Sequence, residues 1–105
     1  IKLMQVGGLA AAVRVAAEAA VHDLRVCLTT GLDSSIATAA VLHLSGALRP
    51  QTASGFATLS LLQGDLVSES LREGPTMTWP KGYGLGVELD ETSPFLRQAV
   101  IYESA

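Results

Sequence analysis

Apolar and polar positions alternate between two patterns in the first sixty residues. Residues 1–6 (IKLMQV) form a short, mostly apolar run that ends at Gly7-Gly8, which favours a strand followed by a tight turn. Residues 9–21 are rich in Ala and Val, and polar side chains recur every fourth residue from position 14 to 22. That spacing predicts a helix with one narrow polar stripe.

The same succession is then repeated. Residues 24–28 are a second strand-like run, and Asp33 and Ser34 are typical N-cap residues before a small-residue helix over residues 35–48. Pro50 is expected to end this helix, and a third short strand is predicted around residues 53–57. Strands and helices in this order indicate a parallel α/β arrangement with right-handed crossovers.

The pattern changes after residue 62. A more polar stretch begins at residues 63–65, a turn is predicted at 73–75 and a short strand at 77–79. The glycines of residues 82–86 are spaced as in a dinucleotide-binding fingerprint, but a charged stretch follows where a helix would have to begin, so we predict a turn. A short helix is expected from Ser93 to Gln98.

Composition narrows the class of protein. Of the 105 residues, 49% are hydrophobic and 16% charged, which indicates a packed core. The net charge is −3 and the seven Lys and Arg residues are scattered, so we expect no nucleic-acid partner. Charged residues interrupt every apolar stretch, so we expect no membrane span. A single cysteine, Cys27, fits a reducing compartment, and we expect a cytoplasmic protein.

Ligands of α/β folds bind where the carboxyl ends of the strands meet. That rule points to residues 5–8, 29–35 and 55–60. Lys2 lies among apolar neighbours of the first strand, where an ammonium is costly unless it serves a site, although a terminal lysine can also extend into water.

Asp33, after the second strand, is a candidate cap of the next helix. Four hydroxyl residues of the same loop are predicted to cap that helix or to donate hydrogen bonds to a ligand carboxylate: Thr29, Thr30, Ser34 and Ser35. The remaining reactive side chains have simpler interpretations. His22 and His43 are expected to be partly exposed helix residues. Cys27 is expected to be a buried packing residue, and Trp79 to anchor a small core or to contact substrate.

Four blocks of sequence, in this order, resemble the C-terminal part of the enolase superfamily: IKLMQVGGL, VCLTTGLDSSIATAAVLHL, ASGFATLSLLQGDL and GYGLGVELDE. The resemblance extends from Lys2 to about Glu91 and is strongest to the muconate-cycloisomerase-like subgroup. It implies the last strands of a (β/α)8 (TIM-type) barrel in residues 1–62. Residues 63–105 would return toward a capping domain outside this chain. A whole barrel needs about 250 residues, so we expect a fragment of a longer protein.

The resemblance also implies a chemistry. Members of this superfamily abstract a proton next to a carboxylate and stabilise the resulting enediolate with Mg²⁺, whose ligands we expect upstream of this chain. Lys2 matches the lysine of the sixth barrel strand, an acid/base in racemising members and a stabilising charge in o-succinylbenzoate synthases. Asp33, Ser34 and Ser35 match an acidic residue and the small polar residues after it, although many relatives have Glu in place of Asp33.

The loop TTGLDSS looks most like that of o-succinylbenzoate synthase, a lyase of menaquinone biosynthesis. Dipeptide epimerase and muconate cycloisomerase, both isomerases, are the alternatives. A third is a truncated, non-catalytic fragment or interaction module. The expected partner is a small carboxylate substrate, and homo-oligomerisation is left open. We expect the 105-residue chain alone to be inactive.

Overall fold

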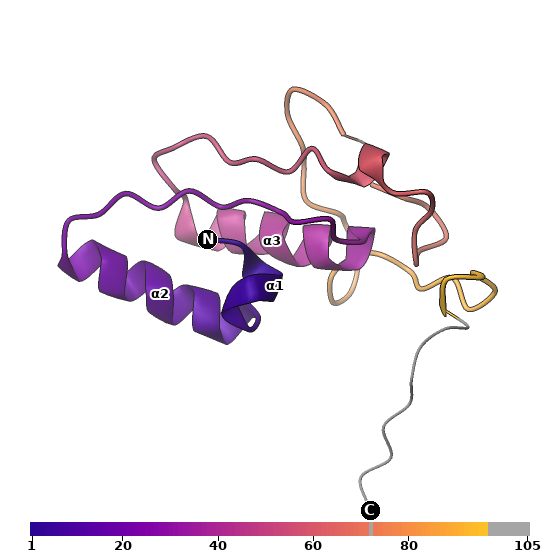
Figure 1. Ribbon diagram of the computed structural model, residues 1–105, viewed down its shortest axis with the longest axis horizontal. Helices are drawn as coiled ribbons and strands as arrows, with labels where there is room; N and C mark the ends of the chain where they lie inside the picture. The colour runs from indigo at the N-terminus through magenta and orange to yellow at the C-terminus, as the bar shows by residue number, and fades with distance from the viewer. Residues whose placement is uncertain (72, 97–105) are drawn as a thin grey trace, which may run out of the picture.

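The computed structural model describes residues 1–71 and 73–96. Within them the chain forms a short helix α1 (Leu3–Val6), two longer helices α2 (Leu9–Val21) and α3 (Ser35–Leu48), and one 3-10 turn, η1 (Leu59–Leu61). The three α-helices contact one another, and an extended segment leads into α3 from α2 while another leaves α3 (Figure 1). None of the helices in this part of the chain has the length and apolar character that crossing a membrane requires.

Both long helices confirm the sequence prediction. The helix α2 ends at Val21, and the amide of the C-cap residue His22 donates to the Ala19 carbonyl. The helix α3 ends at Leu48, and the C-cap residue Arg49 has a left-handed backbone (φ 48°) and donates its amide to the Ser45 carbonyl. Pro50 follows, and because proline cannot continue the helical hydrogen-bond ladder, α3 stops where the sequence indicates.

The three predicted strands are reduced to single parallel β-bridges. Lys2 pairs with Thr29, and Thr29 pairs with Gly55, so the three segments lie side by side in the expected order and direction. Thr29 donates its amide to the Ile1 carbonyl (2.9 Å), and Gly55 donates to Leu28 (3.0 Å). No named strand or sheet is formed within the described residues, which are mostly helical where they are regular.

The prediction of a strand over residues 1–6 is wrong beyond Lys2. The amides of Gln5 and Val6 donate to the Lys2 carbonyl at 3.0 and 3.1 Å, which makes residues 3–6 a helical turn. Gly7 ends that turn with a left-handed backbone (φ 95°), which glycine adopts without strain. The amides of Gln5 and Val6 thus find their acceptor within the turn, whereas in a longer strand they would bond to a neighbouring strand.

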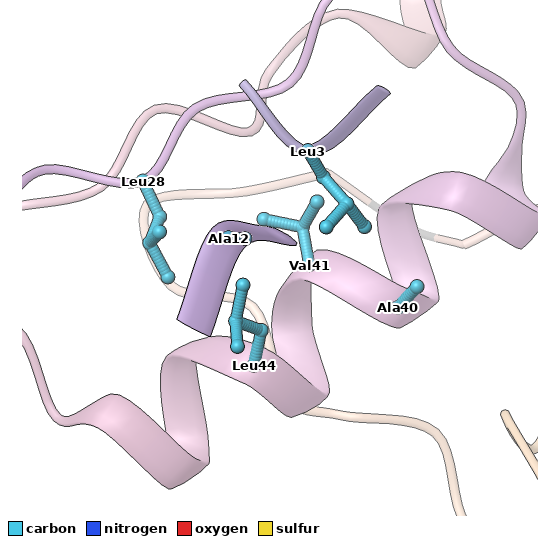
Figure 2. Close-up of a cluster of buried hydrophobic side chains, with 6 residues drawn as sticks. All are labelled: Leu3, Ala12, Leu28, Ala40, Val41 and Leu44. Carbon is cyan, nitrogen blue, oxygen red and sulfur yellow. The ribbon is translucent and has the colours of Figure 1, made fainter. Parts of the chain in front are cut away.

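The core lies between the three helices and the segment before Thr29. Its buried members come from α1, α2, α3 and this segment: Leu3, Ala12, Leu28, Ala40, Val41 and Leu44. Leu3 and Val41 point toward each other between α1 and α3 (Figure 2). Leu28 is 1% exposed, and it therefore fixes the segment that leads to Thr29.

The part of the chain after η1 contacts α3 at Trp79 and Leu85. The side chain of His43 hydrogen-bonds the Leu85 carbonyl (Nε2 to O, 3.1 Å), and the Trp79 ring lies over Gly46. Val67 and Leu89 form an antiparallel bridge. The strand predicted at residues 77–79 is not formed, and the stretch is irregular.

The glycine-rich loop is the predicted turn. Gly82, Gly84 and Gly86 all have positive φ angles, and Gly86 donates its amide to Tyr83 (3.0 Å). The helix predicted from Ser93 to Gln98 extends outside the described residues, which end with a turn closed by Leu96 donating to Ser93 (3.1 Å).

Candidate functional site

Lys2 lies at the carboxyl end of the first bridged segment. Its backbone pairs with Thr29, and α1 begins at the next residue. The side chain is exposed to solvent. The bridges Lys2–Thr29 and Thr29–Gly55 align three parallel segments side by side, so the loops that follow these segments begin at one edge of the row.

Thr30 directly follows Thr29 at this edge but has little contact with solvent. Its side chain is buried, and its hydroxyl shares a hydrogen bond with the Thr58 hydroxyl (2.9 Å). Its amide donates to the Gly55 carbonyl (3.0 Å). Thr58, which is half-buried, is thus the more accessible hydroxyl of the pair. Thr58 was not singled out from the sequence, although it falls within the loop 55–60 that the strand-end rule indicates.

Asp33 closes the loop between Thr29 and Ser35. Its carboxylate accepts the amide of Gly31 (2.7 Å), which forms a local turn. The half-buried carboxylate lies two residues before α3. It therefore holds the loop in shape and has capacity for a further hydrogen bond.

The first helical residue of α3 is capped from another part of the chain. Ser34 occupies the N-cap position, but its side chain makes no capping bond. Instead Asp65 accepts the Ser35 amide at Oδ1 (3.0 Å) and the Ser35 hydroxyl at Oδ2 (2.5 Å). Ser34 therefore occupies the predicted N-cap position, but the capping hydrogen bond comes from the carboxylate of Asp65, thirty residues after Ser35.

The Ser35 hydroxyl is fully committed to the protein. It donates to Asp65 and accepts the Leu71 amide (3.0 Å), and the residue is completely buried. The structure thus brings Lys2 beside Thr29, the residue before Thr30, whereas Asp33 bonds within its own loop and the Ser35 side chain is bonded to Asp65 and Leu71. No signal in the sequence distinguishes Asp65 from the turn residues around it.

Hydrogen bonds govern the ionisation of Asp65. Burial alone would raise the pKa of this carboxyl, but hydrogen bonds from Ser35, Ser70 and Leu66 outweigh it and lower the pKa below its usual value of 3.8. The unfolded chain consequently binds more protons than the folded chain in acid.

We therefore predict that Asp65 contributes stability that is fully present above about pH 4 and is lost as the pH falls through its lowered pKa. In Asp65→Asn the acid limb of stability against pH, measured by urea unfolding, should be flatter than in the parent protein. Glu69→Gln changes an exposed carboxylate nearby and is the control. Parallel acid limbs for the parent and Asp65→Asn would contradict the prediction.

The described residues do not assemble a metal site. No group of three His, Cys, Asp or Glu side chains within residues 1–71 and 73–96 is placed to hold an ion. His22 instead pairs with Glu18 on the surface of α2 (3.0 Å), and the Cys27 thiol donates to the Ala53 carbonyl (3.1 Å). Within this part of the chain the Mg²⁺ expected from the resemblance has no ligand set.

Comparison with known families matches the enolase C-terminal domain-like model over residues 1–93. The chain belongs to the enolase C-terminal domain-like family. Its members are enzymes of the enolase superfamily, which generally bind Mg²⁺ and have α/β domains. The match confirms the superfamily and leaves the subgroup open. Neither the curated proteins nor the solved structures contain a match to this chain.

Proposed function

We propose that this chain forms the last part of the barrel of an Mg²⁺-dependent enzyme that abstracts a proton next to a substrate carboxylate. The observation that carries the proposal is the row Lys2–Thr29–Gly55, in which a lysine lies beside the loops that follow the next two segments. In parallel α/β enzymes such an edge is where substrates bind. The family match over residues 1–93 supports the same assignment.

The role proposed for Lys2 is electrostatic. When a base from elsewhere in the enzyme takes the α-proton, the electron pair of the C–H bond moves toward the carboxylate and leaves an enediolate. An exposed ammonium at this edge is placed to stabilise that negative charge. In a dehydration, the electron pair then forms the new C=C bond, and the β-hydroxyl leaves as water after taking a proton.

Among the possible reactions we favour o-succinylbenzoate synthesis. The loop TTGLDSS begins at Thr29, which pairs with Lys2, and its side chains Asp33 and Ser34 are only half-buried. Dipeptide epimerisation and muconate cycloisomerisation are the alternatives, since both also pass through an enediolate anion next to a carboxylate. The metal ligands and the first catalytic lysine would come from a longer polypeptide, so the 105 residues by themselves are proposed to be inactive.

Three parallel assays of the whole Mg²⁺-loaded enzyme that carries this segment test the proposal. We expect formation of o-succinylbenzoate from its hydroxy acid precursor, and a rate of dipeptide epimerisation or muconate cycloisomerisation at least about tenfold lower in kcat/KM. Epimerisation in excess would move the assignment to the epimerase. Absence of all three, and of deuterium exchange next to a carboxylate in D₂O, would contradict the catalytic assignment and favour a non-catalytic module.

A further inference from the structure

Asp65 joins the start of α3 to the C-terminal segment. Its Oδ2 accepts hydroxyl hydrogen bonds from Ser35 (2.5 Å) and Ser70 (2.7 Å). Its Oδ1 accepts the amides of Ser35 (3.0 Å) and Leu66 (2.8 Å). One carboxylate thus receives four hydrogen bonds, which is close to its full capacity as an acceptor.

Two buried serines complete this junction. The Ser35 hydroxyl accepts the Leu71 amide, and the Ser93 hydroxyl donates to the Asp65 backbone carbonyl (3.0 Å). Ser35 is completely buried and Ser93 is 3% exposed. Asp65 is half-buried and Ser70 is exposed, but the two buried serines would each leave an unpaired polar group behind if they moved, so they resist displacement.

The junction fixes one end of the loop 29–35. The other end is held independently, since Thr29 is bonded to Ile1 and Thr30 to Gly55. Between the two ends, the hydrogen bond from Gly31 to Asp33 is the side-chain contact that shapes the loop. Without Asp65 the loop would keep its first anchor and lose its second.

We propose that Asp65 is a positioning residue that holds the loop 29–35 in the conformation that receives the substrate, acting through Ser35. The proposal rests on the proposed function, because it takes this edge as the substrate site. Asp65 itself does not reach the edge, and its carboxylate is occupied by Ser35, Ser70 and Leu66. Fixing both loop ends before binding removes an ordering cost that would otherwise weaken substrate affinity.

Steady-state kinetics of Asp65→Asn in the whole enzyme test the proposal. The amide keeps the shape of the side chain but replaces one charged acceptor oxygen by a donor, so the Ser35 and Ser70 hydroxyls lose that acceptor. We expect KM to rise by about tenfold with kcat within about twofold of the parent. Asp90→Asn is the matched control, since the Asp90 carboxylate accepts hydrogen bonds from Thr92 in an exposed turn outside the loop 29–35. Its KM should not change.

Two further measurements keep the outcome decisive. Ser35→Ala removes only the hydroxyl arm of the junction and should raise KM in the same direction, which covers the case in which Asp65→Asn does not fold. Amide hydrogen exchange at Gly31 should be faster in either variant than in Asp90→Asn. A fall in kcat and thermal stability with KM and Gly31 exchange unchanged would overturn the proposal. A parent enzyme with no turnover would instead overturn the proposed function, and Gly31 exchange would still decide whether Asp65 orders the loop.

Discussion

Lys2→Ala is expected to lower kcat/KM of the Mg²⁺-loaded enzyme by about 10²- to 10⁴-fold, the range associated with loss of one positioned acid/base or charged group. The side chain is exposed at the edge where three bridged segments meet, so its removal should leave the fold unchanged. The thermal midpoint of the variant should therefore equal that of the parent. Lys81→Ala, which removes the other lysine of the chain from the glycine-rich loop, is the matched control and should retain full activity.

Lys2→Arg then distinguishes two roles for the same group. Arginine keeps the positive charge but stays protonated in proteins, so it can stabilise an enediolate and cannot deliver or accept a proton. If Lys2 acts by charge, as proposed for the synthase, Lys2→Arg should retain much more activity than Lys2→Ala. Equal losses in both variants would favour proton transfer and hence an epimerase. Full activity of Lys2→Ala would remove Lys2 from the site altogether.

The helices were predictable because their signals are local. The small and apolar residues of positions 9–21 and 35–48, bounded by Gly7-Gly8 and Arg49-Pro50, are sufficient to place α2 and α3. Helical hydrogen bonds close within four residues, so they do not depend on distant partners. The same locality explains why residues 3–6 form a turn of helix where an apolar run suggested a strand.

The pairing of the extended segments follows the predicted order but not the predicted extent. A strand requires a partner along its whole length, and here each pair meets at a single residue, Thr29 with Lys2 and Thr29 with Gly55.

The principal contacts of the candidate site were also non-local. The Thr30–Thr58 and Ser35–Asp65 hydrogen bonds span 28 and 30 residues, and no spacing rule connects such positions.

Leu28→Ala is expected to destabilise the protein by about 3 kcal/mol, because the side chain is 1% exposed and truncation of a buried leucine leaves a cavity that its neighbours fill incompletely. Leu28 packs with Leu3 from α1 and Val41 from α3, so its loss weakens contacts on both sides of the core. Urea unfolding followed by circular dichroism measures the change. Leu24→Ala, in the same extended segment but 63% exposed, is the control and should change stability by less than about 0.5 kcal/mol.

The position of Leu28 connects this loss of stability to the site. The residue directly precedes Thr29, and its carbonyl accepts the Gly55 amide (3.0 Å), so the core side chain and the bridged edge share one backbone segment. Leu28→Ala should therefore speed amide exchange at Gly55 more than at the amide of Gly86, which bonds Tyr83 and not the Leu28 segment. Equal acceleration at both amides would mean that the cavity lowers global stability only. Unchanged stability would show that Leu28 does not anchor the core, and that the edge carrying Lys2 and Thr29 is held by its backbone hydrogen bonds instead.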